Sequence, residues 1–282
     1  MQILHTKKEV REFRQKCQTL GLVPTMGALH NGHKSLMQES LANNSHTLVS
    51  IFVNPTQFSP NEDFSTYPRN LQKDLEFCES IGVSAVFAPN IEEIYPLDSH
   101  TQSTIARDET TLNPPHTMGY ILEGFSRPSH FAGVLQVVLK LLCLTSPTRA
   151  YFGKKDAQQV LLIQKMVRDF FLPIEIVPCE IVRDTDGLAL SSRNVYLSKK
   201  ERENALCIPK CINLIHSQIQ SGVTNVGTLQ AIAEQNLQEV KLEYARFYSH
   251  TLQPLQEVQK GESIFLIAAR VGKTRLIDNL WC

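Results

Sequence analysis

Residues 24–33 read Pro-Thr-Met-Gly-Ala-Leu-His-Asn-Gly-His, and this stretch decides the fold of the 282-residue chain. The short apolar run of residues 20–23 precedes it, and a helix-like stretch of residues 34–43 follows it. The order of strand, glycine-containing turn and helix places backbone N–H groups at a helix N-terminus, where they can face an anion. Gly27 and Gly32 let the main chain approach a ligand without an intervening side chain. The stretch therefore predicts a phosphate-binding turn, here called the HxGH turn.

Two histidines, His30 and His33, bracket Asn31-Gly32 in this turn. The HxGH pattern is typical of nucleotidyl-transfer enzymes that act on the α-phosphate of ATP, and imidazole N–H groups can donate to phosphate oxygens. Zinc ligation is one alternative, but it needs a third and a fourth ligand, and no Cys-x-x-Cys occurs in the chain. Ordinary surface or cap histidines are the other alternative. Because the strand, the glycines and the helix all agree, we favour nucleotide binding as the hypothesis.

Composition excludes several classes of function. Hydrophobic residues make up 42% of the chain, and 28 basic residues balance 28 acidic ones, as in a globular protein without an electrostatic preference for nucleic acid. The first eight residues lack an apolar signal core. The longest apolar stretch, residues 131–144, is interrupted by Gln136 and Lys140 and is too short to span a membrane. Seven scattered cysteines indicate reduced thiols in a cytoplasmic protein, with Cys207 and Cys211 expected to serve packing.

The first part of the chain alternates strand-like and helix-like segments. The strand-like segments are residues 20–23, 47–53, 83–88 and 174–177, and the helix-like segments are residues 34–43, 71–81, 131–144 and 157–170. This alternation predicts an α/β fold, a Rossmann-like doubly wound parallel sheet with helices on both faces. Such sheets bind ligands at the carboxyl ends of their strands, where the HxGH turn falls.

The pattern changes after about residue 181. Two helical stretches now precede two strand-like ones: residues 199–221, 228–242, 244–249 and 263–270. Helices grouped before strands predict a second, smaller α+β C-terminal domain of ordinary size. We therefore expect a first domain of residues 1–181 and a second domain of residues 182–282.

Residues 152–159, Phe-Gly-Lys-Lys-Asp-Ala-Gln-Gln, form a second glycine-to-helix turn. Gly153 and Lys155 suit a phosphate, and Asp156 can cap the helix or orient a lysine, although lysines near glycines are usually only solvated. Gln57 lies in the loop just past a strand, where ligand-contacting residues gather. Taken alone, it is a turn residue.

Two further loops carry cationic groups. Residues 186–194, Asp-Gly-Leu-Ala-Leu-Ser-Ser-Arg-Asn, end near Arg193, whose fork of donors suits a phosphate. The two serines of that loop can cap the following helix, or the loop can close as a clamp over a triphosphate, and both interpretations stay open. Arg127 and His130 lie in residues 123–133, either as partners of a phosphate or carboxylate or as parts of a plain turn before a helix.

Together these segments resemble the pantoate–β-alanine ligase family over nearly the whole chain. The matching motifs follow the family's order at compatible spacing: residues 24–33, 54–58, 67–69, 123–133, 152–159 and 187–196. Three positions depart from the family's pattern, Ser129 for glycine, Ala157 for tyrosine and Leu190 for methionine. Each lies beside an expected functional position without removing a charged or amide group.

The resemblance implies a two-step reaction and a set of contacts. ATP, expected with Mg²⁺, and pantoate give a pantoyl adenylate and pyrophosphate; the amine of β-alanine then displaces AMP to give pantothenate. It implies nucleotide contacts at Met26, Gly27, Ala28, Leu29, His30, Asn31, Gly32, His33, Gly153, Lys154, Lys155, Asp156, Val182, Leu190, Ser191, Ser192 and Arg193. Gln57 and Gln159 fall on positions that hold pantoate, with Gln57 also near β-alanine. The resemblance favours a homodimer through the larger domain.

Catalysis is assigned to four of these side chains. The resemblance makes His33 a proton donor, and His30, Lys155 and Arg193 join it because two anions must be brought together during adenylation. No protein metal ligands are expected. The main alternative is another HxGH nucleotidylyltransferase that retains AMP in its product. A catalytically silent nucleotide-binding module is the alternative outside the enzymes, and the joint presence of the expected lysine, histidine and glutamines argues against it.

Overall fold

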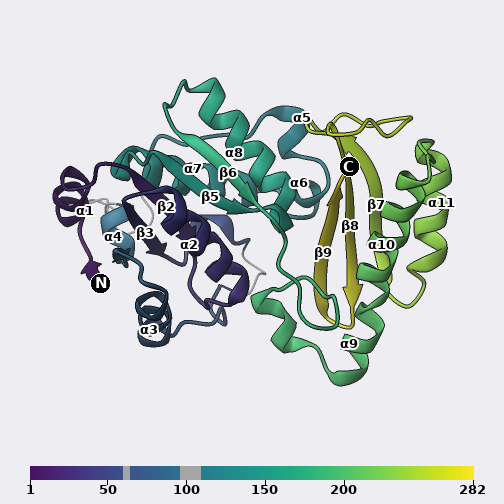
Figure 1. Cartoon of the computed structure of the whole chain (residues 1–282), viewed down its shortest axis with the longest axis horizontal. Helices are drawn as coiled ribbons and strands as arrows, with labels where there is room; N and C mark the ends of the chain where they lie inside the picture. Colours follow the sequence, from purple (N-terminus) through teal and green to yellow (C-terminus); the bar gives the residue numbers. More distant parts are fainter. Residues whose placement is uncertain (60–63, 96–108) are drawn as a thin grey trace. The chain divides into compact units, whose positions relative to one another are not determined.

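A computed structural model describes residues 1–59, 64–95 and 109–282 of the chain (Figure 1). It divides into two compact units, the first comprising Met1–Gly153 and Gln158–Cys179 and the second Lys154–Ala157 and Glu180–Cys282. The division expected from the sequence was a single cut after residue 181. The structure instead places the short segment Lys154–Ala157 with the C-terminal unit, although it lies within the first domain in sequence.

The first unit contains a six-stranded sheet in the order β1-β4-β3-β2-β5-β6. All of its strand pairs are parallel. The strands are β1 (Gln2–Leu4), β2 (Leu20–Thr25), β3 (His46–Ile51), β4 (Ala85–Phe87), β5 (Arg149–Gly153) and β6 (Glu175–Cys179). The predicted parallel α/β fold is confirmed.

Strand order reverses between β2 and β5, because the chain runs from β2 outward to β3 and later from β5 outward to β6. The connections that follow these two neighbouring parallel strands run to opposite sides of the sheet. A crevice forms between them at the carboxyl ends of the strands, and this is the usual ligand site of such sheets. The HxGH turn leaves β2 after Thr25, and the second glycine turn starts from Gly153 at the end of β5. Both predicted turns therefore start from the two strands that form the switch point.

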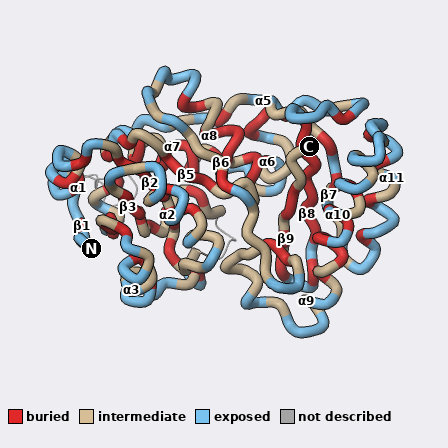
Figure 2. Tube along the Cα trace, in the orientation of Figure 1, coloured by how far each residue is buried: buried red, intermediate tan, exposed pale blue. Residues whose placement is uncertain are grey.

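Helices connect these strands. They are α1 (Lys7–Gln15), α2 (Asn31–Asn43), α3 (Leu71–Ile81), α4 (Ile91–Ile94), α5 (His116–Gly119), α6 (Glu123–Ser126), α7 (His130–Thr145) and α8 (Ala157–Asp169), with the short 3-10 turns η1 (Pro55–Gln57) and η2 (Lys154–Asp156). Consecutive residues of β2, Leu20 to Val23, point to opposite faces and are all buried, so both faces of the central strand are covered (Figure 2).

The second unit contains an antiparallel sheet of β7 (Lys241–Ser249), β8 (Ser263–Val271) and β9 (Thr274–Trp281) in that order. Its helices are α9 (Lys199–Ala205), α10 (Cys207–Gln220) and α11 (Val226–Asn236), after the 3-10 turn η3 (Ser192–Tyr196). Stacked rings of Phe247 and Phe265, 4.5 Å apart, lie in the core of this unit. Cys207 and Cys211 are buried in the same core. This arrangement confirms the predicted smaller α+β part.

The structure corrects two predicted helices. The helix expected over residues 199–221 is broken at Leu206, because Pro209 lacks an N–H and its ring would clash with a continuing turn. The helix expected over residues 228–242 ends at Asn236, and β7 begins at Lys241. Within the described residues, no helix has the length and apolar character needed to cross a membrane.

Candidate functional site

The HxGH turn is held in an unusual backbone conformation. Gly27 and Ala28 have φ angles of 81° and 51°, in the left-handed region that favours glycine. His30 then starts α2 as its N-cap in an extended conformation. A non-glycine residue in the left-handed region costs about 1–3 kcal/mol and persists only where its surroundings enforce it. The conformation of Ala28 therefore requires a partner that holds it in place.

Asp74 on α3 is the partner that holds Ala28 in this conformation. The residue is 5% exposed, and its two carboxylate oxygens accept the N–H groups of Ala28 at 3.0 Å and Leu29 at 2.9 Å. A Cβ at Gly27 would lie 2.8 Å from the same carboxylate, so this position also requires glycine. Sequence reasoning missed Asp74 because an acidic residue in the first turn of a helix is ordinary.

The two histidines of the turn contact each other and the helix end. Nδ1 of His30 accepts the N–H of Gly32 at 3.1 Å, and Nδ1 of His33 accepts the N–H of His30 at 3.3 Å. The neutral ring of each therefore carries its proton on Nε2. The cap interpretation is thus realised at Nδ1 of both rings. The ring centroids lie 4.1 Å apart, so two Nε2–H donors occupy one small region.

Gln57 and Met26 lie together in the first unit. Gln57, 7% exposed, directs its Nε2 to the Met26 sulfur at 2.8 Å, and its Oε1 accepts from Nδ2 of Asn54 at 3.2 Å. Asn54 is fully engaged, since its Oδ1 also accepts from the hydroxyls of Thr56 at 3.0 Å and Tyr95 at 2.9 Å. The turn that bears Gln57 is therefore fixed by a buried amide network, whereas the sequence indicated only a turn just past a strand.

Arg127 and His130 contact the main chain of that turn. Nδ1 of His130 lies 3.0 Å from the carbonyl oxygen of Gln57, and Nη1 of Arg127 lies 3.2 Å from Nε2 of His130. A guanidinium only donates, so Nε2 accepts and Nδ1–H donates to the carbonyl. The Arg127 Nη2 also donates to this carbonyl at 3.4 Å. These contacts hold the backbone of Gln57, a role that neither sequence interpretation of Arg127 and His130 named.

Helix α7 approaches the Gln57 turn very closely at Gly133. A Cβ there would lie 2.4 Å from the Thr56 carbonyl oxygen and 2.6 Å from the Gln57 backbone nitrogen. These are backbone atoms that cannot rotate away. The absence of a side chain at Gly133 is therefore a condition for the position of Gln57.

The adjacent glutamines of α8 differ in their environments. Gln158 is buried; its Nε2 donates to the carbonyls of Met118 at 2.8 Å and Ile121 at 2.9 Å, and its Oε1 accepts the N–H of Glu123 at 3.0 Å. Gln159 is half-buried. The amide of Gln158 thus holds three backbone groups in place. Gln159 stays the residue of the pair that is expected to contact pantoate.

The 3-10 turn η2, here called the lysine turn, belongs to the second unit. Nζ of Lys155 lies 3.4 Å from the Asp156 carboxylate. Lys154, also expected to contact nucleotide, pairs instead with Glu180, and its Nζ lies 5.6 Å from the centroid of the Trp281 ring. The ammonium group of Lys155 is thus paired within its own turn, and that of Lys154 with a residue outside it.

Residues 182–190 form a narrow two-sided loop in the second unit. The Leu190 N–H donates to the Val182 carbonyl at 3.0 Å, and Gly187 turns the chain with a φ of 91°. Arg202 bridges Asp184 at 2.6 Å and Asp186 at 2.7 Å. Burial alone would raise the pKa of the Asp186 carboxyl, but the hydrogen bonds from Arg202 and from a backbone N–H hold it below its ordinary value.

The end of this loop carries the predicted serines and arginine. The Ser191 hydroxyl accepts the N–H of Arg193 at 3.3 Å and so caps η3. One of the two open interpretations, the cap, is thus seen for Ser191.

The expected contact residues are divided between the two compact units. The first unit contains residues 26–33, Gln57, Gly153 and Gln159, and the second contains Lys154, Lys155, Asp156, Val182, Leu190, Ser191, Ser192 and Arg193.

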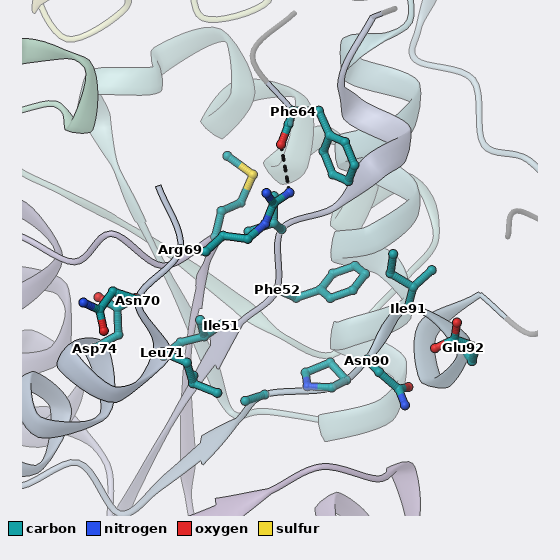
Figure 3. A pocket seen from close by; sticks show the side chains of 14 residues that line it. Ile51, Phe52, Phe64, Arg69, Asn70, Leu71, Asp74, Asn90, Ile91 and Glu92 are labelled. Atoms are coloured by element: carbon teal, nitrogen blue, oxygen red, sulfur yellow. Dashed lines mark hydrogen bonds between the residues drawn. The ribbon is translucent and has the colours of Figure 1, made fainter. Parts of the chain in front are cut away.

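A cavity of about 410 Å³ borders the HxGH turn in the first unit (Figure 3). Of the predicted site residues, Met26 lines it, and the rest of the lining comes mainly from the ends of β3 and β4 and from α3 and α4. Arg69 is one of its lining residues, and the Nη2 of Arg69 donates to the Phe64 carbonyl at 2.8 Å. The cavity thus adjoins the predicted site and does not coincide with it.

Among the described residues, no group of three or more His, Cys, Asp or Glu side chains is arranged to hold a metal ion.

Comparison with known proteins gives consistent results. The family model for pantoate-beta-alanine ligase matches residues 2–281. A pantothenate synthetase of Helicobacter pylori (strain G27) is 52% identical over 282 residues, 100% of both chains. A solved pantothenate synthetase of Thermus thermophilus is similar with a TM-score of 0.91 and 38% identity, over 100% of this chain and 99% of that one. The Francisella tularensis pantoate-beta-alanine ligase, complexed with beta-gamma ATP and beta-alanine, has a TM-score of 0.77 and 37% identity, over 100% and 97%.

Proposed function

The chain belongs to the pantoate–β-alanine ligase family, and we propose that its HxGH turn and lysine turn carry the adenylation half of that reaction. The enzyme condenses pantoate with β-alanine to give pantothenate, through a pantoyl adenylate, and releases AMP and pyrophosphate. The observation that carries the residue assignment is the geometry at the start of α2. There, two histidines use Nδ1 for the helix cap and hold their protons on Nε2.

In the first step, a carboxylate oxygen of pantoate attacks the α-phosphorus of ATP, and the bond to the β-phosphate breaks with release of pyrophosphate. Both reactants are anions, so donors aimed at the phosphate oxygens lower the barrier. His30 and His33 at the N-terminus of α2, Lys155 and Arg193 are proposed to supply this field. His33 is proposed as the proton donor.

Gln57 and Gln159 are proposed to hold pantoate. An amide offers both donors and an acceptor, which suits a substrate with hydroxyls and a carboxylate. The buried network around Asn54 and the contact with His130 support this role for Gln57, because they fix its backbone before the substrate arrives. In the second step, the β-alanine amine attacks the acyl carbon, AMP leaves with the bonding electrons, and the new amide loses a proton.

ATP is proposed to enter as its Mg²⁺ complex. Mg²⁺ at phosphate sites is bound mainly by substrate phosphates and water, with one or two protein carboxylates. The exposed Asp156 carboxylate on the lysine turn suits this mode of binding. The bound ion would neutralise charge on the departing pyrophosphate.

A homodimer in the cytoplasm is proposed as the working state. Family resemblance supports the dimer, and seven free thiols suit a reducing compartment. Light scattering coupled to size exclusion tests the dimer, since a monomeric mass at assay concentrations contradicts it.

Pyrophosphate exchange tests the residue roles. With ATP and pantoate alone, labelled pyrophosphate should appear in ATP, and adding β-alanine should release AMP and not ADP. We expect His33→Ala to slow the exchange by about 100- to 1,000-fold, the usual effect of removing one preorganised donor. His46→Ala is the matched control, because His46 starts β3 at the opposite, amino end of the sheet. A His33→Ala enzyme that exchanges at the parent rate contradicts the assignment.

A further inference from the structure

Asn279 lies near the end of β9, far in sequence from every predicted motif. The residue is 3% exposed, and its Nδ2 donates to two consecutive carbonyl oxygens of the lysine turn. The distances are 2.9 Å to Lys154 and 2.9 Å to Lys155. Both partners belong to the same compact unit as Asn279, so this contact is internal to the second unit.

The two hydrogen bonds determine the course of the lysine turn. A primary amide presents two N–H groups from one nitrogen, so it can satisfy both carbonyls at once. With both peptide groups held, the Cα of Lys155 and the direction in which its side chain leaves the backbone are fixed as well. Few other side chains of this size can do the same, because a carboxylate only accepts and a serine has one donor.

The strand that carries Asn279 is itself rigidly anchored. β9 pairs with β8 through Leu266 and Asn279 and through Ile267 and Asp278. The carboxylate of Asp278 accepts from both terminal nitrogens of Arg183, at 2.7 and 3.0 Å, and from the Asn279 N–H at 2.8 Å. An orienting group on a sheet strand holds its partner more precisely than one on a loop.

We propose that Asn279 is a positioning residue for adenylation, acting through Lys155. This inference rests on the proposed role of Lys155 at the phosphates. The amide nitrogen of Asn279 contacts the backbone of the lysine turn and takes no part in the chemistry itself. A displacement of the lysine by about 1 Å is enough to slow a reaction of this kind by up to about 100-fold.

The test compares the two half-reactions of the full-length enzyme. For Asn279→Ala, we expect pyrophosphate exchange with ATP and pantoate to fall by about 10- to 100-fold. Release of AMP from supplied pantoyl adenylate by β-alanine should stay near the parent rate. A loss of folded protein lowers both rates by the same factor, so their ratio separates positioning from stability. Asn279→Asp, which keeps the shape but lacks the donors, is the second variant.

Ser263→Ala is the matched control within the same sheet. Ser263 is fully buried on β8, and its hydroxyl accepts the Gln259 N–H at 2.7 Å. We expect this variant to lose stability without changing the ratio of the half-reactions.

A double-mutant cycle with Lys155→Ala completes the test. If Asn279 acts through Lys155, adding Asn279→Ala to Lys155→Ala should slow the exchange little further, because the effects of coupled residues do not add. Additive losses, or equal losses in both half-reactions, overturn the inference. Normal exchange by Lys155→Ala alone would instead refute the proposed role of Lys155, so the two failures are distinguishable.

Discussion

Replacing Asp74 tests whether the HxGH turn depends on this buried carboxylate. In Asp74→Ala, the N–H groups of Ala28 and Leu29 lose the oxygens that they now contact at 3.0 and 2.9 Å. A hydrogen bond to a charged group contributes about 1.5–3 kcal/mol net. Relaxation of the left-handed Ala28 returns about 1–3 kcal/mol of stored strain. Two such bonds contribute about 3–6 kcal/mol, so after the strain of Ala28 is returned the expected net loss in unfolding free energy of the first unit is centred at about 2.5 kcal/mol.

The same change should damage catalysis, because the relaxed turn no longer holds His30 and His33 in the position proposed for phosphate binding. We expect pyrophosphate exchange to fall by about 10- to 100-fold, with a higher KM for ATP. Asp74→Asn keeps the shape and one acceptor but turns an NH₂ group toward a backbone N–H. The Asp74→Asn protein should therefore also be less stable than the parent. Because this variant keeps the volume of the side chain, its loss of stability is due to the changed hydrogen-bond polarity.

Urea unfolding should be followed by far-UV circular dichroism. The single tryptophan, Trp281, lies in the second unit and does not report on the turn. Asp169→Ala is the control, since Asp169 pairs with Lys165 on the surface of α8 and such a pair contributes only about 0.5 kcal/mol. The reasoning is refuted if Asp74→Ala matches the parent within about 0.5 kcal/mol and keeps its KM for ATP.

Three further outcomes follow from the contacts described. Gln159→Ala should raise the KM for pantoate and leave the melting temperature unchanged. Gln158→Ala should lower the melting temperature and leave the KM for pantoate unchanged; calorimetry and pantoate saturation curves distinguish the two variants. Gly133→Ala should raise the KM for pantoate, because its Cβ would displace the backbone of the Gln57 turn; an unchanged KM contradicts this. Iodoacetamide at about pH 8, just below the ordinary pKa of a free thiol, should label the exposed Cys143 first. Burial raises the pKa of the Cys78 thiol to about 12, so equal labelling of Cys78 in mass spectra would contradict the described core.

The fold could be predicted from the sequence where hydrophobic periodicity is strong. Helix α3 begins and ends at the predicted residues 71 and 81, and α7 extends the prediction by one residue at each end. β9 was missed because Thr-Arg-Leu-Ile-Asp-Asn-Leu-Trp mixes buried polar residues into a strand. Its burial arises from pairing with β8 and from cover by residues distant in sequence, which local patterns do not contain.

In the candidate site, too, some residues could be predicted from local sequence and others depend on tertiary packing. Sequence motifs name the side chains expected to touch substrate, such as His33 and Gln57, because these lie in short motifs directly after strands and match the family's pattern. They do not name Asp74 or Asn279, whose spacing from the motifs reflects only tertiary packing. A carboxylate in a helix and an asparagine in a late strand have many ordinary explanations, and only the contacts select among them.

The polarity of each of these two residues follows from the part of the backbone that it meets. The HxGH turn presents N–H groups, because it leads into the N-terminus of α2, and a carboxylate with two acceptors satisfies a pair of them. The lysine turn presents carbonyl groups to β9, and an amide nitrogen with two donors satisfies that pair. Aspartate and asparagine have nearly the same shape, so packing alone would accept either residue at either position. Asp74→Asn and Asn279→Asp would each set like against like at a buried turn, where an unmatched polar group costs about 1–3 kcal/mol. The identity of these residues is therefore fixed by hydrogen-bond polarity, and through the two turns it determines where the expected catalytic side chains stand.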